Sequence, residues 1–139
     1  MMLPALVLLL SISLSIPDWL TAVAPANLNT TQKEAIVVLI VRMEGCSSCR
    51  LQPKSIKEKI DTWASKNDLV VHYVSLVVCQ RQKDVRFITK NNATFGTVVA
   101  DVSGIRAREI SGNDGNVSAV VFHGNREKLI RTQSDINSL

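Results

Sequence analysis

Two long apolar runs with an amphipathic segment between them form the clearest pattern in this chain. The runs cover residues 35–41 and 69–78 and are rich in β-branched side chains, which is typical of strands buried on both faces of a sheet. Between them, an apolar stripe recurs at helical spacing opposite a charged face, formed by Ile56, Ile60, Trp63 and Ala64. This order predicts a right-handed βαβ unit with parallel strands.

A few residues set the expected limits of the helix in this unit. We expect it to begin close to Cys46 and Cys49 and to end at Asn67 and Asp68. Pro53 falls within its first turns and either bends the helix or marks its regular start, because proline lacks the N–H and crowds the preceding turn.

The second half of the chain is more polar, and its pattern is less regular. Residues 80–92 predict a short helix, whereas residues 97–110 fit either a strand or a loop. Two short apolar runs, 118–122 and 128–131, flank a turn sequence at 123–126 and predict a β-hairpin. The C-terminal residues show no amphipathic helix, so the expected fold ends on this hairpin.

The N-terminus begins with an apolar run over residues 3–16. This length is typical of the core of a secretory signal peptide and is too short for a comfortable membrane span. Small residues follow at 22–24 and 24–26, and we expect cleavage after Ala26, because Pro25 would directly follow the earlier cut. The alternative is an uncleaved signal anchor, since no Lys or Arg precedes the run. The expected parts are a signal peptide at 1–26, a polar lead-in at 27–34 and one domain at 35–139.

Three glycosylation sequons favour the same compartment. They begin at Asn29, Asn92 and Asn116, and none has a proline in the middle position. The net charge of +4 is spread along the chain and only 4% of residues are aromatic, so there is no basic run with interleaved aromatics to indicate a nucleic-acid partner. We therefore expect a secreted, extracellular glycoprotein that has no membrane segment once the signal is removed.

The strongest chemical signal is the dithiol Cys46-Ser47-Ser48-Cys49, which directly follows the first predicted strand. At the start of a helix, unpaired N–H groups and the macrodipole stabilise a thiolate, and the thiolate is the form that attacks disulfides. Cys46 is the candidate nucleophile and Cys49 its resolving partner in a redox disulfide. Arg42 could lower the Cys46 pKa further. Arg50 would act in the same direction, and Glu44 would oppose them both. Such a dithiol at the strand-to-helix junction of a βαβ unit predicts an α/β, thioredoxin-like fold.

Other interpretations of the cysteines stay open. A zinc site would need two further ligands, and Cys79, His72 and His123 do not form a paired motif, so we expect no metal and no other cofactor. A static Cys46–Cys49 disulfide would instead indicate a non-enzymatic secreted binding module. Cys79 is expected to be a half-buried free thiol that packs as a small hydrophobe, although an intermolecular disulfide or a resolving role toward Cys46 is also open. His72 is expected to pack and His123 to lie in a turn.

The chain resembles the N-terminal domain of the selenoprotein P family. The resemblance rests on the residues before the dithiol, the dithiol itself, and two later strands, at 36–40, 46–49, 71–77 and 119–122. It implies a secreted thioredoxin-like module in which Cys46 stands at the selenocysteine position and Cys49 at the resolving one. The substrates implied are protein disulfides or small peroxides, with glutathione as an exchange partner.

This sequence departs from that family in three respects. Selenocysteine, the selenocysteine-rich tail and the histidine-rich stretches are missing, which argues against selenium transport and heparin binding. The fold normally places a cis-proline opposite the dithiol, and the region expected there, 104–106, contains no proline. All prolines lie earlier, at positions 4, 17, 25 and 53. With no final helix visible, the chain looks like a truncated or diverged member.

Overall fold

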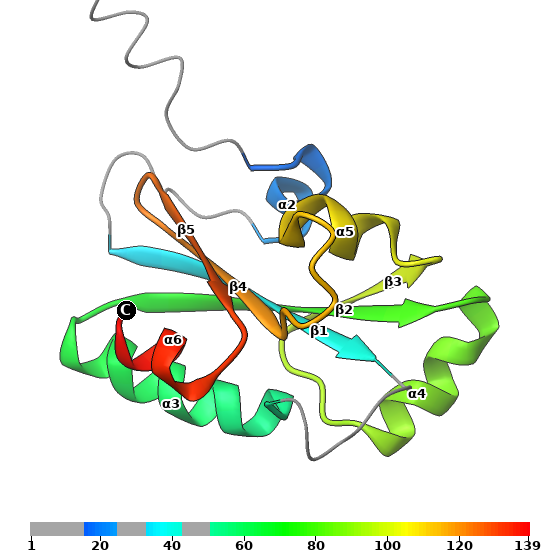
Figure 1. The fold of residues 1–139 in the computed structure, drawn as a ribbon, viewed down its shortest axis with the longest axis horizontal. Helices are drawn as coiled ribbons and strands as arrows, with labels where there is room; N and C mark the ends of the chain where they lie inside the picture. The colour runs from blue at the N-terminus through cyan, green and yellow to red at the C-terminus, as the bar shows by residue number, and fades with distance from the viewer. Residues whose placement is uncertain (1–15, 25–32, 43–50) are drawn as a thin grey trace, which may run out of the picture.

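The structure, a computed structural model, describes residues 16–24, 33–42 and 51–139 of the chain. A five-stranded mixed sheet runs through its centre in the order β3-β2-β1-β4-β5 (Figure 1). Its strands are β1 (Glu34–Arg42), β2 (Val70–Cys79), β3 (Thr97–Val102), β4 (Ala119–His123) and β5 (Arg126–Ile130). Its helices are α2 (Asp18–Val23), α3 (Pro53–Lys66), α4 (Val85–Asn91), α5 (Ile105–Ser111) and α6 (Gln133–Asn137), with a 3-10 turn at Gln82–Asp84 before α4.

The central strand β1 confirms the βαβ prediction. It pairs in parallel with β2, where Val38 lies opposite Val74, and antiparallel with β4, where Val38 lies opposite Val120. Residues 35–41 are buried, as expected for a strand with helices on both faces. Together with the β4–β5 hairpin, this arrangement gives the α/β, thioredoxin-like fold that the sequence predicted.

Helices cover the sheet on two faces (Figure 1). On one face, α3 and α6 pack on Val37 and Leu39, and α4 packs beside Val41 and Val77. On the other face, α2 and α5 pack on the alternate side chains of β1 and β2. Because successive strand residues point to opposite faces, one apolar run supplies both halves of the core.

Helix α3 begins at Pro53, so the regular-start alternative is confirmed for this proline. Proline suits the first helical position, where its missing N–H is not needed. Leu51 and Gln52 are not helical, so α3 does not extend back to the dithiol as we had expected. The helix ends where predicted, and Asp68 adopts a positive φ of 55° beyond it.

Two parts of the fold, residues 97–110 and the C-terminal segment, differ from the structure that the hydrophobic pattern predicted. Residues 97–110 contain both β3, which pairs in parallel with β2 at the edge of the sheet, and α5. The expectation of a missing last helix is wrong, because α6 forms after β5. A capping box between Thr132 and Asp135 fixes it, in which Asp135 Oδ2 accepts a hydrogen bond from the Thr132 N–H (3.0 Å). The same oxygen also accepts from the Arg131 N–H (2.8 Å). Ile136 then packs into the core beside α3.

Within the described ranges, no helix has the length and apolar character needed to cross a bilayer.

Candidate functional site

The carboxyl edge of the parallel strands is the place where the predicted dithiol belongs. β1 ends at Arg42 and α3 begins at Pro53, so residues 43–52 connect these two elements. Cys46 and Cys49 themselves fall in 43–50, outside the described residues, as do Glu44 and Arg50. Their roles and their disulfide therefore stay predictions.

Four strands contribute to this edge. β2 and β3 end there together, with Cys79 opposite Val102, and Val78 lies opposite Arg42. The start of β4 reaches the same edge, where the Ile40 N–H donates to the Ser118 carbonyl (2.9 Å). In Figure 1 the arrowheads of β1, β2 and β3 point to this side of the molecule.

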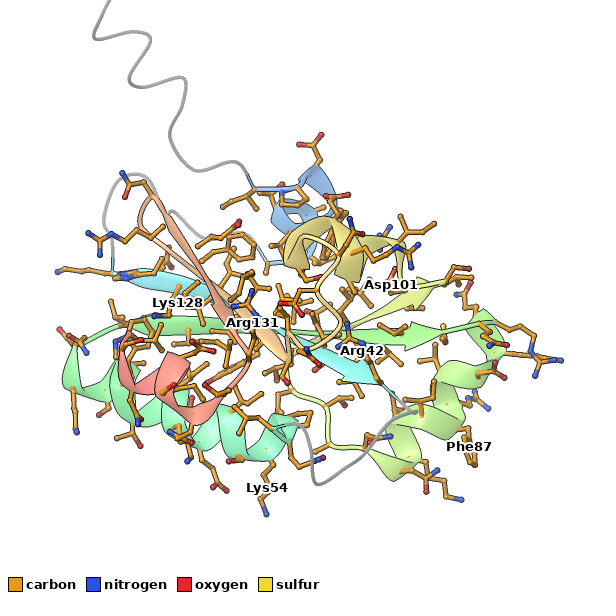
Figure 2. All side chains as sticks on the ribbon, in the orientation of Figure 1. Arg42, Lys54, Phe87, Asp101, Lys128 and Arg131 are labelled. Carbon is orange, nitrogen blue, oxygen red and sulfur yellow. The ribbon has the colours of Figure 1, made fainter. Side chains whose placement is uncertain are left out.

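A cleft of about 250 Å³ lies at this edge on the α5 face of the sheet, and its lining includes Arg42, Val78, Ser103, Gly104, Arg108 and Asp114. The Arg42 guanidinium donates from Nη1 to the Val117 carbonyl (2.9 Å), and the Arg108 guanidinium donates from Nη1 to the Ser103 carbonyl (2.8 Å). Figure 2 shows Arg42 and Asp101 at this end, whereas Lys54 points away from the fold. The cleft is therefore lined by two arginines anchored on backbone carbonyls.

Asp101 holds one wall of the cleft in place. Its carboxylate is 2% exposed and accepts hydrogen bonds from the Arg106 and Ala107 N–H groups, both at 2.9 Å, which satisfies the first turn of α5. The turn into the helix places Ser103 and Gly104 at positive φ (66° and 69°). A buried carboxylate is stable here because two backbone donors replace its hydration.

The segment before β4 forms the opposite wall. Asp114 accepts from Arg131 Nε at 2.6 Å and from the Asn116 N–H at 2.9 Å. The Arg131 hydrogen bond first, and the Asn116 N–H next, hold the pKa of Asp114 below its usual value. Within the described residues, the Ser118 hydroxyl oxygen is buried without a hydrogen-bond partner. An unpaired buried hydroxyl is uncommon, and this one lies beside the end of β1.

Cys79 lies at the same edge but under the other face of the sheet. Its side chain is 6% exposed and packs with Val41, Val77 and Ile88 beneath α4. Burial raises the pKa of the Cys79 thiol, and the charges of Asp84 and Asp101 raise it further. The prediction that Cys79 packs as a small hydrophobe is confirmed, and its burial is greater than expected; among the described residues its thiol is free.

The two histidines lie at the other end of the sheet. His72 pairs with Ile36 of β1, and its Nε2 lies 3.3 Å from Glu34 Oε1. His123 ends β4, and its ring meets Trp63 edge-on at 5.6 Å. His72 and His123 therefore lie far from Cys79, and the other ligands of the zinc alternative, Cys46 and Cys49, fall outside the described residues. In the part of the chain that the structure describes, no three His, Cys, Asp or Glu side chains are grouped to hold a metal ion.

The region expected to face the dithiol needs correction. Residues 104–106 begin α5 rather than lying before the antiparallel strand β4. Val117 and Ser118 hold that place, and neither is a proline. The expected region was placed at 104–106 because residues 97–110 have no clear secondary-structure pattern in the sequence.

Three features around the cleft were not predicted: Asp101, Ser118 and the Asp114–Arg131 pair. The role of Asp101 could have been predicted from the sequence. A short side chain that accepts hydrogen bonds, followed by Ser103-Gly104, is typical of the capped start of a helix. The other residues gain their roles only through contacts with distant strands.

The predicted glycosylation residues have different surroundings. Asn116 is exposed in the turn before β4. Asn92 is partly buried, and its side-chain amide donates to the Ile88 carbonyl at the end of α4 (3.0 Å). Asn29 falls outside the described residues.

Comparison with known proteins gives one structural likeness. No family model and no curated protein matches this chain. Among solved structures it is similar to one described as a thiol:disulfide interchange protein, DsbE, from Chlorobium tepidum. The two share 13% identity over 77% of this chain and 75% of that one, with a TM-score of 0.48. At this identity and TM-score, nothing about the role of that protein is carried over to this chain.

Proposed function

We propose that this protein is a secreted thiol–disulfide oxidoreductase in which Cys46 attacks the substrate and Cys49 resolves the product. The observation that carries the proposal is the path of the chain at the carboxyl edge of the sheet. Residues 43–50, which contain both cysteines in the sequence, connect β1 to α3 there. The carboxyl edge of parallel strands is where α/β folds of this kind bind and transform their ligands.

The proposed reaction balances without a cofactor. The Cys46 thiolate attacks one sulfur of a substrate disulfide and displaces the other sulfur as a thiolate, which leaves a mixed disulfide. The Cys49 thiolate then attacks Cys46 and releases the reduced substrate. Two electrons pass from the Cys46/Cys49 dithiol to the substrate disulfide, and glutathione can reduce the new Cys46–Cys49 disulfide by the same exchange.

A small peroxide is the other substrate that the selenoprotein P resemblance suggests. The Cys46 thiolate would break the O–O bond, giving a sulfenic acid and an alcohol or water. Cys49 would condense with the sulfenic acid, releasing water and forming the same disulfide. We favour protein disulfides, because the adjoining cleft opens beside backbone-anchored arginines at the edge where a substrate chain would approach.

A specific observation also supports the alternative of a non-enzymatic binding module with a structural disulfide. Leu51 and Gln52 separate Cys49 from the first turn of α3. The stabilisation of a thiolate by a helix end falls off within one turn, and the regular start of α3 at Pro53 comes four residues after Cys49. Ser118 also stands where the fold normally offers a proline to the substrate backbone.

The deciding experiment is reduction of insulin by the purified secreted protein, with Cys46→Ser, Cys49→Ser and, as the matched control, Cys79→Ala. We expect Cys46→Ser to fall to the rate without protein, Cys49→Ser to accumulate a mixed disulfide, and Cys79→Ala to keep its activity because that thiol is buried. A dithiol potential of about −120 to −270 mV supports exchange, whereas one below about −300 mV indicates a structural disulfide. If Cys46→Ser reduces insulin as well as the unmodified protein, the proposal is wrong.

A further inference from the structure

Helix α2 is part of the folded domain, although it lies inside the segment predicted to be a signal peptide. Leu20 is fully buried and Ala24 is 5% exposed, and both belong to the apolar cluster that contains Val38 and Phe122. Ile16, Trp19 and Val23 pack against the same cluster. In Figure 1, α2 lies beside α5 on one face of the sheet.

Polar contacts join α2 to α5 at the rim of this cluster. The Trp19 indole Nε1 donates to Glu109 Oε1 at 3.4 Å. The Arg106 guanidinium lies 5.2 Å from the centre of the Trp19 ring, a distance suited to a cation–π contact. Both partners of Trp19 come from α5, so the two helices are matched in side-chain chemistry as well as in apolar packing.

The pattern of apolar residues changes at the start of helix α2. Positions 16, 19, 20, 23 and 24 follow the i, i+3, i+4, i+7, i+8 pattern of a helix that buries one face. Asp18 and Thr21 are exposed on the other face. The preceding run at 5–10 is apolar on every side, as in the core of a signal peptide. One segment of sequence therefore has the pattern of a leader, and the next has the pattern of a surface helix.

Cleavage after Ala26 would remove this helix and expose the apolar face of the sheet beneath it. Val38 and Phe122 would lose the Leu20 side chain that packs in their cluster. Exposed apolar patches of this kind lower stability and favour aggregation. A cut before Ile16 keeps the cover in place.

We propose that secretory processing cuts the chain between Ser15 and Ile16, so that α2 stays in the mature protein. Ser13 and Ser15 provide small residues at the third and first positions before the cut, as signal peptidase requires. Hydrolysis consumes one water at the Ser15–Ile16 amide and leaves a carboxylate on Ser15 and an ammonium group on Ile16. The inference rests on the secretion that the proposed function assumes.

The N-terminus of the protein collected from the medium of secreting cells tests this directly. We expect terminal sequencing to give Ile16-Pro17-Asp18-Trp19. A mature protein that begins at Asn27, or at any residue other than Ile16, overturns the inference and leaves secretion intact. An uncleaved chain that stays with the cells overturns secretion itself, so the two failures are distinguishable.

Two pairs of variants make the test independent of a single sequencing result. Ser15→Leu places a large residue before the cut, and we expect it to abolish the Ile16 terminus, whereas Ala26→Leu leaves that terminus unchanged. Leu20→Ala should lower the melting temperature of the secreted protein by roughly 10 °C, because a buried leucine is lost. Thr21→Ala, on the exposed face of α2, should change it by no more than about 2 °C. Equal melting temperatures for these two variants, or a loss of processing only in Ala26→Leu, would overturn the proposal.

Discussion

The two ends of β1 lie in different surroundings, although one continuous apolar strand runs through both. At the amino end, the polar side chains form paired contacts between neighbouring strands and helices, such as His72 with Glu34 and His123 with Trp63. At the carboxyl end, the Asp101 carboxylate accepts hydrogen bonds from two backbone N–H groups. The Ser118 hydroxyl is buried there without a hydrogen-bond partner among the described residues. A cleft opens beside the second set.

This difference shows where the fold can support a reacting group. The His72–Glu34 pair at the amino end joins two partly exposed side chains, so it adds little stability. Contacts at the carboxyl end fix the backbone of two loops, one before α5 and one before β4. Rigid backbone around an incompletely filled space is what a substrate site requires.

The largest expected effect comes from removing the carboxylate of Asp101. Asp101→Ala leaves the first N–H groups of α5 without an acceptor in a buried position, and we expect a loss of about 3 kcal/mol in the free energy of unfolding. Denaturant unfolding measures this directly. Asp101→Asn keeps one acceptor oxygen and should lose less.

His72→Ala is the matched variant at the amino end, where the partly exposed pair with Glu34 should contribute at most about 1 kcal/mol. If His72→Ala costs as much as Asp101→Ala, the proposed contrast between the two ends is wrong.

A smaller effect of opposite sign is expected at Ser118. Ser118→Ala removes a buried hydroxyl that lacks a partner within the described residues, so stability should rise by up to about 1 kcal/mol. The substitution also destroys the sequon at Asn116, and Asn116→Gln serves as the control for loss of the glycan. Thermal unfolding of both variants separates the two effects. A clear loss of stability in Ser118→Ala alone would contradict this expectation and show that the hydroxyl is satisfied in the folded protein.

The smallest effect concerns the acid dependence of the carboxyl end. The pKa of Asp114 is lowered chiefly by its hydrogen bond from Arg131. A carboxyl with a lowered folded pKa stabilises the protein fully above its unfolded pKa of about 3.9, and this contribution disappears as pH falls through the folded pKa. Asp114→Asn should therefore melt slightly lower than the unmodified protein at pH 7, and the difference should vanish toward pH 2. A difference that stays constant with pH would show that the pair does not act through its charge.

Local patterns predicted much of the sheet and its main helix. The runs at 35–41 and 69–78 indicated β1 and β2 because a strand buried on both faces needs apolar side chains at successive positions. The α3 stripe and the turn at 123–126 were also readable, since each depends on residues close in sequence. The same local logic failed for β3, α5 and α6. These elements are short, and they are held by packing or by capping contacts rather than by a long periodic pattern.

The sequence by itself determined that a dithiol follows the first buried strand, because the spacing of two cysteines and the apolar run are properties of neighbouring residues. Only the tertiary structure decided what lies around the end of that strand. Arg42 reaches the Val117 carbonyl, Asp101 caps α5, and Cys79 turns under α4 away from the cleft. Only the tertiary structure, too, placed 16–24 in the core. These outcomes depend on strand register and on which face each side chain takes, and both are set by contacts between residues far apart in the chain.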